Sequence, residues 1–488
     1  MHFKQRTGIL LIFLLLGLVS TSQAALEIER GPIYGLLRKA LPFENLELAG
    51  YLKNETALRT AHGLDEFMKE SNIAQLEAEY TFNEHVQFFT ILRWFYDAVY
   101  ELENKYANDP QWESKTNQKL KHPEKLQWLR ECYLDVLTDS LDLRLGKQQV
   151  VWGTADGVRI LDIVNPLDYR DWTLKDYIDS RLPLWMINAE GKILLNGHLQ
   201  LLLIPDYEAN YYPPAGAPFT LRTVRLGALP PSNPMITTST ISEKPAHTFK
   251  NTKVGLRWRQ IIEGQAFEYT LNYLHAYDFA SSAYTSFVFP NVFVTRRAEG
   301  IDVLGGTFSK TITEGIFFPG VAKGWTLRGE LAYIKGGAMN FGTDASIVGT
   351  VDVDQCNYVL GFDKTFFTNL MFSFQFIQMW ALQREKPTNF VKPTQTLLNG
   401  ATRGPLDECE TILTLLLATD FMHERLKPQV LILYGDDNDW RISPKVSYEI
   451  NDQWLATMGL HFFEGKEQHL SGQFDKNDQL FFELKYTF

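Results

Sequence analysis

The chain of 488 residues has only three cysteines, Cys132, Cys356 and Cys409, and none lies in a CxxC or another metal-ligand spacing. A disulfide scaffold is therefore not expected, although Cys356 and Cys409 fall at the start of two predicted strands and could pair. Basic residues are also scarce, with 47 Lys and Arg against 58 Asp and Glu, a net charge of -11. Because nucleic-acid binding calls for a basic surface, we expect no nucleic-acid partner.

Long apolar runs and catalytic signatures are missing as well. Beyond residue 24 no apolar run approaches the roughly 18 residues of a membrane-spanning helix; the longest is Thr411 to Thr419. The sequence contains no HExxH, P-loop, GxSxG or GxGxxG element in a fitting context, and its histidines are scattered. We therefore predict no catalytic residue, no metal centre and no cofactor.

What the sequence has instead is a period-two alternation of apolar and polar residues along most of its length. In the last nine residues Leu480, Phe482, Leu484, Tyr486 and Phe488 share one face of an extended strand, and the other face is mostly polar. Bacterial outer-membrane barrels commonly end on an aromatic residue that their assembly machinery reads. We predict Phe482, Leu484, Tyr486 and Phe488 as this assembly signal. The mean hydropathy of -0.18 fits, because only alternate barrel residues face lipid.

The beginning of the chain has the pattern of a secretory signal. Lys4 and Arg6 precede the apolar stretch Ile9–Val19, and a small-x-small cleavage site ends at Ala24. Export followed by insertion into the outer membrane of a Gram-negative cell is therefore expected. The predicted organisation is a signal peptide over 1–24, a periplasmic segment and possible plug over 25–45, and a transmembrane barrel over 46–488.

About seventeen alternating segments can be counted between residues 46 and 488, joined by short and long connections in turn. Short periplasmic turns and long outer loops are typical of outer-membrane barrels. If both termini are periplasmic, the strand number must be even, so one further strand is expected within the proline-rich stretch 205–248, in its aromatic part 205–222. The sequence thus predicts an all-β, antiparallel barrel of about 18 strands (16–18) with periplasmic termini.

On several predicted strands, charged residues share the face opposite the apolar ones. An Arg or Lys that faced lipid near the bilayer midplane would cost roughly 2–4 kcal/mol, so these charges should point into the lumen. Their mixed signs indicate a salt-bridged, water-lined interior; an ion-pair network that only stiffens the wall is the alternative. The lumen candidates on strands are Glu77, Glu79, Arg144, Arg257, Arg259, Arg328 and Glu330.

Residues 127–172 carry three motifs, at Leu129–Tyr133, Arg144–Gly153 and Asn165–Asp168. This stretch resembles the signature region of a family of Gram-negative outer-membrane proteins, domain of unknown function thirteen-oh-two. Thr154 stands where the family often has an acidic residue. The resemblance implies a porin-like or transporting outer-membrane barrel without enzymatic activity, and it fixes no substrate.

The stretch 153–190 is too long for a turn and rich in aromatic residues. A long insertion is usually functional or disordered, and aromatic density argues against disorder. We predict that it folds into the lumen and partly occludes it; a packed outer cap is the alternative. The constriction candidates within it are Asp156, Arg159, Asp168, Arg170 and Trp172.

The leading hypothesis is an outer-membrane channel or transporter that admits small amphiphilic or hydrophobic molecules. The alternatives are a structural or assembly barrel that anchors a partner, and an interfacial lipid hydrolase. Expected partners are outer-membrane lipid, the barrel-assembly machinery and a small-molecule cargo, while the oligomeric state is open. Asp436, Asp437 and Asp439 form a weak calcium candidate, because clustered oxygens suit hard cations, but a plain turn fits equally.

Overall fold

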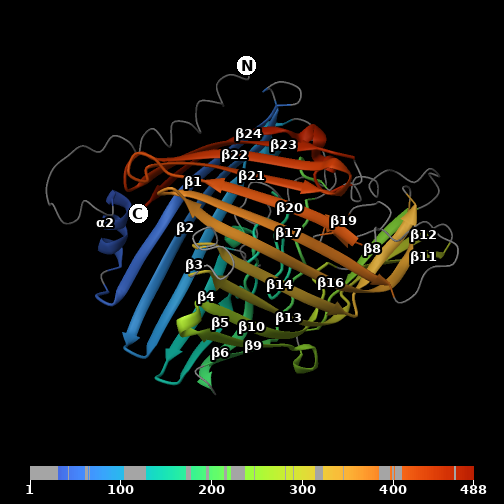
Figure 1. Cartoon of the computed structure of the whole chain (residues 1–488), viewed down its shortest axis with the longest axis horizontal. Coiled ribbons are helices and arrows are strands. Elements are labelled where there is room, and N and C mark those ends of the chain that lie inside the picture. The colour runs from blue at the N-terminus through green and yellow to red at the C-terminus, as the bar shows by residue number, and fades with distance from the viewer. Residues whose placement is uncertain are drawn as a thin grey trace.

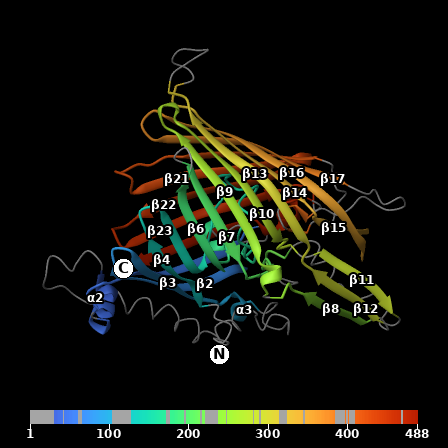
Figure 2. The same cartoon turned by 90° about the horizontal axis from the view of Figure 1, so that it is seen from below.

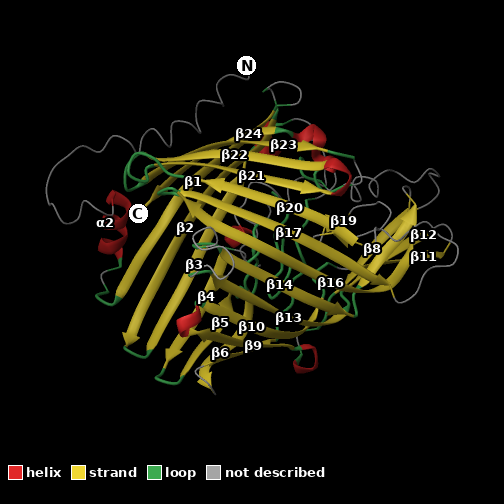
Figure 3. Cartoon of the chain, in the orientation of Figure 1, coloured by secondary structure: helices red, strands yellow, loops and turns green. Residues whose placement is uncertain are grey.

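The computed structural model describes residues 31–41, 43–60, 64, 66–103, 128–171, 177–193, 197–213, 217–220, 237–246, 248–280, 282–288, 291–313, 323–343, 346–383, 396–397, 400–401, 409–466 and 469–488. Strands dominate these ranges (Figure 3). The longest described helix is α2 (Gly31–Ala40), and no described helix is long and apolar enough to cross a membrane. The predicted signal peptide, 1–24, lies outside the described residues.

The strands close into one antiparallel barrel (Figure 1). The main sheet has 19 strands; β15 (Ala338–Thr343) pairs only with β16, and the other eighteen form the closed wall. Each wall strand pairs with the next, and β24 pairs with β1, where Tyr51 lies opposite Thr487. The prediction of an all-β barrel of about 18 strands is confirmed. The wall strands are β1 (Leu46–Arg59), β2 (Phe67–Asn83), β3 (Val86–Asp97), β4 (Leu129–Leu137), β5 (Leu141–Gln148), β6 (Leu184–Ile193), β7 (Gly197–Ile204), β9 (Lys253–Ile262), β10 (Phe267–Tyr277), β13 (Gly300–Thr311), β14 (Thr326–Lys335), β16 (Ser346–Phe366), β17 (Leu370–Gln383), β20 (Cys409–Ala418), β21 (Leu426–Gly435), β22 (Asp439–Glu449), β23 (Trp454–Glu464) and β24 (Gln479–Thr487).

The period-two pattern separates an apolar outer face from a polar inner face. On β24, Phe482 and Leu484 point outward and are 41% and 40% exposed, whereas Gln479 points inward and is fully buried. Exposed aliphatic and aromatic side chains in a continuous outer band suit hydrocarbon rather than water. Further outward residues of this band are Leu271, Leu304, Leu331, Leu360, Trp380, Met458 and Phe462.

Most short connections lie at one rim of the barrel and most long ones at the other. The exceptions are Asp436–Asn438 between β21 and β22, which is short but at the long-loop rim, and the 14 residues between Thr311 of β13 and Thr326 of β14, which are at the short-turn rim. At the short-turn rim β2 and β3 are joined by Glu84 and His85, and α2 lies beside the start of β1, near the C-terminus (Figure 1). There the N–H of Thr487 donates to the carbonyl of Gln453 (2.8 Å). The first wall strand therefore begins, and the last one ends, at the same rim. The periplasmic location of that rim stays a prediction.

The eighteenth strand was expected in 205–222, and this was wrong. It is β6, which pairs with β5 at Leu184 and with β7 at Ile187, while β7 pairs directly with β9. The wall strand β6 thus takes the end of the predicted insertion 153–190. The sequence pattern did not separate β6 from β7, because Ile193, Leu194 and Leu195 form an apolar run between them. The two strands were therefore predicted as one.

The predicted insertion 205–248 also contains ordered structure. Its strand β8 (Thr237–Glu243) joins β11 (Ser282–Val288) and β12 (Asn291–Arg297) in a separate three-stranded sheet, in which β8 and β12 are parallel. Figure 2 shows this sheet beside β15 and β16, away from the short-turn rim. A two-stranded sheet pairs β18 (Thr396–Leu397) with β19 (Gly400–Ala401).

Cys356 and Cys409 lie on β16 and β20, on either side of Trp380 of β17. Two strand spacings separate their backbones by roughly 9–10 Å, more than the ~7 Å that a disulfide spans. Both thiols are free, and so is Cys132.

Candidate functional site in the barrel interior

Residues 149–171, here called the inner segment, run from the end of β5 into the barrel. Their apolar side chains, among them Val158 and Ile160, form one buried cluster with inward residues of the wall. Because these wall residues come from strands on many sides, the segment lies within the closed wall. The wall residues of the cluster include Leu184 of β6, Leu202 of β7, Leu274 of β10, Val303 of β13, Ala332 of β14, Val359 of β16, Ile377 of β17, Ile412 of β20 and Leu433 of β21.

Trp152 is the largest side chain of this cluster and is 1% exposed. Its Nε1 donates to Oε1 of Gln200 on β7 (2.8 Å). Gly255 of β9 makes room for the ring, since a Cβ there would lie 2.9 Å from Cη2 of Trp152. A motif residue at the start of the segment is thereby fixed against two wall strands.

Asn165 folds the segment back on its own beginning. Its fully buried side chain accepts the N–H of Val150 (2.8 Å) and donates to the carbonyl of Leu182 (3.0 Å). Two residues later, the N–H of Leu167 donates to Oδ1 of Asn210 (2.7 Å). The Asn165–Pro166 motif therefore closes a loop inside the barrel.

Three predicted residues, Asp156, Arg328 and Glu330, meet where the inner segment contacts β14. The carboxylate of Glu330 is buried and accepts the backbone N–H groups of Thr154 and Leu161, the latter at 3.2 Å. Arg328 donates to the carbonyl of Thr154 and to the carboxylate of Asp156. The apolar side chains of the inner segment are buried, and charged groups of the wall form hydrogen bonds with its polar backbone.

Asp156 and Arg328 are also tied to β16 and β17. Nε of Arg328 lies 2.7 Å from Oδ2 of Asp363, and Nη2 donates to Oγ of Ser373 (3.1 Å). Nε2 of Gln375 donates to Oδ2 of Asp156 (2.9 Å). This network joins one loop to three adjacent wall strands.

A small cavity of about 210 Å³ lies within the segment, between Gly153 and Glu330. Arg159, another predicted residue, lines it together with Asp162 and Arg181. Asp162 is shared by the two guanidinium groups, at 2.7 Å from Arg181 and 3.8 Å from Arg159. The cavity is lined by charged as well as apolar side chains and is large enough for several water molecules.

A family model described as protein of unknown function (DUF1302) matches residues 70–488. The chain belongs to this family. The resemblance of residues 127–172 is confirmed. Of the DUF1302 motifs, Leu129–Tyr133 lies in β4, Arg144–Gly153 covers the end of β5 and the start of the inner segment, and Asn165–Asp168 lies near the end of that segment. No curated protein matches the chain.

Several solved porins are similar to this DUF1302 barrel. OccAB3 of Acinetobacter baumannii is 9% identical, with 91% of this chain and all of that chain covered and a TM-score of 0.49. OccK8 (OprE) of Pseudomonas aeruginosa is 10% identical, with 91% and 98% covered and a TM-score of 0.49. A BenF-like porin of Pseudomonas fluorescens is 10% identical, with 91% and 98% covered and a TM-score of 0.48.

The end of the inner segment holds the predicted pair Asp168 and Arg170. The guanidinium of Arg170 donates to both carboxylate oxygens of Asp168 (2.6 and 2.7 Å) and faces the rings of Phe95 and Tyr211. Burial disfavours the charged guanidinium, but Asp168 outweighs it and raises the pKa of Arg170. Trp172 lies outside the described residues.

A buried ion-pair network on β1, β2 and β3 was not predicted. Lys69 is 2% exposed and bridges Glu55 (2.5 Å) on β1 and Asp171 (3.3 Å) of the inner segment. Beside it Arg93 binds Asp179 of α6 (Tyr177–Ser180) at 2.7 Å. Burial alone would raise the pKa of Asp179, but Arg93 and further cations hold it well below its usual range. Charged residues that alternate with apolar ones on β1 were the available signal.

The remaining lumen candidates also face the interior. They form ion pairs within the wall, contact the inner segment, or line a pocket near the short-turn rim. Arg144 binds Asp135 (2.7 Å), and Arg259 binds Glu268 (2.6 Å). Arg257 donates to the carbonyl of Val151 (3.1 Å), again in the inner segment. Glu77 and Glu79 instead line a pocket of about 350 Å³ near the short-turn rim, together with Glu47, Asp452 and Phe488.

The acidic outer turn does not gather its carboxylates at one point. Asp437 binds Lys466 (2.8 Å), Asp439 accepts the N–H groups of Ser471 and Gly472, and Asp436 accepts that of Thr411. Among the residues that the structure describes, no group of three or more His, Cys, Asp or Glu could hold a metal ion. The turn reading fits these contacts better than the calcium reading.

Proposed function

We propose that this DUF1302 protein is an outer-membrane channel that admits small amphiphilic or hydrophobic molecules through a lumen narrowed by the inner segment. Passage is non-covalent. The outer-membrane location follows from the continuous apolar outer band of the closed wall.

One observation carries the proposal: an apolar segment is buried inside a membrane barrel and is held there by side chains of the wall. A barrel of eighteen strands is wide enough for an aqueous channel unless something fills it. Trp152, Val158 and Ile160 fill part of this one. The wall also carries the inward charged pair Arg259 and Glu268, and Glu77 lines a pocket near the short-turn rim; such charges suit a water-lined lumen.

The proposed cargo class rests on the aromatic side chains near the long-loop rim. Tyr169 of the inner segment and Tyr212, both half-buried, stack on each other with 5.5 Å between ring centroids. Aromatic surfaces with a few polar groups between them bind amphiphilic molecules by stacking and hydrogen bonding.

The test is single-channel recording of the purified protein in planar bilayers. The unmodified chain should conduct in discrete steps, and a variant in which a short Gly-Ser linker replaces residues 155–163 should conduct more strongly. A variant without residues 283–296, the β11–β12 hairpin, is the matched control and should conduct like the unmodified chain. Silence of the unmodified chain would favour the anchoring barrel, and equal conductance of the loop variant would refute the narrowing.

A further inference from the structure

The helix α2 has an apolar side and a polar side. Its apolar residues recur at i, i+3, i+4 and i+7 and therefore share one side; they are Ile33, Leu36, Leu37 and Ala40. Arg38 comes two residues after Leu36, which is about 200° further round the helix, so it lies on the opposite side. On the surface of a water-soluble protein such a helix packs its apolar side against the core.

In this structure α2 is turned the other way round. Leu36 is 69% exposed, and the other apolar residues of its side are exposed or half-buried. Nη1 of Arg38 donates to the carbonyls of Phe43 and Leu46 (both 2.6 Å), so the polar side faces the start of β1. The helix is thereby fixed to the first wall strand, and its apolar side is turned away from the protein.

The exposed apolar surface continues from α2 toward the wall. Leu41 is 38% exposed and Phe43 is 57% exposed, so three large apolar side chains stand open along this short stretch. Figure 2 shows α2 at the edge of the barrel, at the short-turn rim and not across its opening. A contiguous apolar surface of this kind marks a site of contact with a membrane or a partner.

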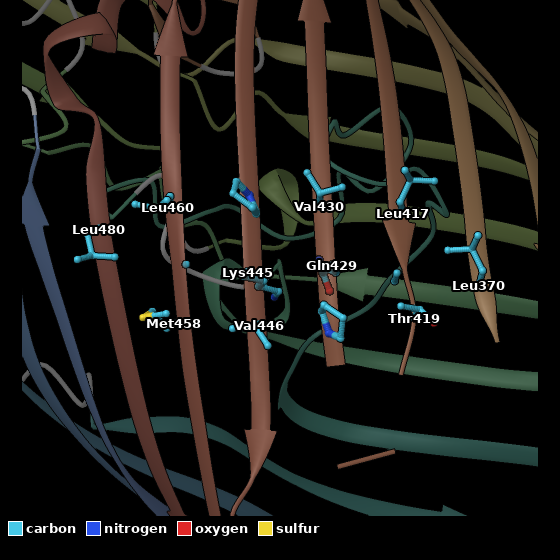
Figure 4. Close-up of a pocket in the computed structure, with 14 residues that line it drawn as sticks. Leu370, Leu417, Thr419, Gln429, Val430, Lys445, Val446, Met458, Leu460 and Leu480 are labelled. Carbon is cyan, nitrogen blue, oxygen red and sulfur yellow. The ribbon is translucent and has the colours of Figure 1, made fainter. Parts of the chain in front are cut away.

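The lipid-facing surface of the wall reaches the same rim. An apolar groove of about 470 Å³ crosses the outer wall from β24 to β17 (Figure 4). At one end it is lined by Leu370, the first residue of β17, which directly follows the short turn from β16. Hydrocarbon therefore extends to the level of the short turns. The helix α2, at that rim, lies where acyl chains give way to lipid headgroups.

The charges of α2 suit a phospholipid surface. The helix carries Arg38 and Lys39 and no acidic residue, in a chain whose net charge is -11. Lys39 is exposed and follows Leu36 by three residues, so the two side chains are neighbours on the helix surface. A lysine beside an apolar surface can cover it with its alkyl stem while the ammonium group reaches a lipid phosphate.

We propose that α2 is an interfacial anchor that lies in the headgroup region of the bilayer at the short-turn rim. Leu36, Leu41 and Phe43 enter the upper acyl chains, and Lys39 binds phosphates. The partner is the phospholipid surface, because the bilayer surrounds the wall at this level, whereas a second copy of the chain would have to present a matching apolar surface there. The inference goes beyond the channel function and needs no cargo. Since Arg38 ties α2 to β1, the anchor fixes the depth of the barrel in the membrane.

Spin labels test which medium surrounds the helix. A nitroxide is attached to Leu36→Cys in the purified protein, with its three native cysteines replaced by serine, in bilayers of phosphatidylcholine and phosphatidylglycerol. Collisions with oxygen, which concentrates in hydrocarbon, are compared with collisions with nickel(II) ethylenediaminediacetate, which stays in water. The references are Leu360→Cys on the outer face of β16, 41% exposed, and His85→Cys in the turn between β2 and β3. Heat-dependent mobility in SDS gels verifies that each variant has formed the closed barrel.

We expect the ratio of oxygen to nickel collisions at Leu36→Cys to be several-fold higher than at His85→Cys and to approach that at Leu360→Cys. Lys39→Cys, at the border of the apolar side, should lie between the two references. Predominant nickel collisions at Leu36→Cys, with oxygen predominant at Leu360→Cys, would overturn the anchor and leave the channel untouched.

Two further outcomes separate the alternatives. Few collisions with either reagent at Leu36→Cys would mean that protein covers the helix, either a second copy or the chain itself, and would overturn the lipid anchor. Predominant nickel collisions at Leu360→Cys would show that the outer wall does not face hydrocarbon. That result would overturn the proposed outer-membrane channel together with the anchor.

Discussion

Replacing Glu330 by Ala should release the inner segment from β14. The carboxylate accepts two backbone N–H groups of the segment, those of Thr154 and Leu161, in a buried position. Hydrogen bonds to charged groups contribute about 1.5–3 kcal/mol each, so the loss amounts to about 3–6 kcal/mol of docking free energy. At about 1.4 kcal/mol per factor of ten, the undocked population should rise about 10²- to 10⁴-fold.

Hydrogen exchange followed by mass spectrometry measures this release without any assumption about transport. Peptides that cover residues 150–165 should exchange faster in Glu330→Ala, and Glu330→Gln, which keeps one acceptor, should lie between the variant and the unmodified chain. Glu268→Ala is the matched control, because Glu268 binds Arg259 of the wall and not the inner segment. Unchanged exchange in Glu330→Ala would refute the assignment of these bonds, since the apolar cluster alone would then hold the segment.

Three further outcomes follow from other contacts. Gly255→Val should displace the Trp152 ring and shift its fluorescence to the red, whereas Gly300→Ala, with nothing within 4 Å of its added Cβ, should not; equal spectra would contradict the packing. Burial raises the pKa of Asp278, beyond the end of β10, from 3.8 to about 6, so the folded state binds a proton more tightly and loses stability as the pH rises through this range. Asp278→Asn should reduce that loss, seen as a smaller fall of the thermal midpoint between pH 4 and 6, and a fall of unchanged size would exclude this carboxyl. Mass spectrometry of the unreduced protein should find Cys356 and Cys409 as thiols, and a bridged peptide would disprove the strand order between them.

The wall was predictable because each strand carries its own signal. β14 (Thr326–Lys335) is an example, since Arg328 and Glu330 alternate with Leu327 and Leu331 whatever the rest of the chain does. β6 was missed because Ile193, at its end, is followed in the sequence by the apolar Leu194 and Leu195, so no polar break marks the end of the strand. β14 has a periodic pattern of its own, whereas the sequence carries no marker for the end of β6.

The interior contacts could not be predicted in the same way. Arg328, Glu330 and Asp156 were expected in the lumen, but the bond between Thr154 and Glu330 joins residues 176 positions apart. Which wall strand faces the segment depends on how far round the barrel the sheet turns, and no local pattern encodes that. Lys69 was missed for the same reason, because its partner Asp171 comes from the inner segment.

The burial of an apolar segment within the wall also has a consequence for assembly. Residues 149–171 lie between β5 and β6 in sequence, so they are synthesised before β24, the strand that pairs with β1 and closes the cylinder. Their apolar side chains can pack against the inner face of the early strands while the later strands are still unpaired. The same residues that restrict the finished lumen would then act first as an internal template for its closure.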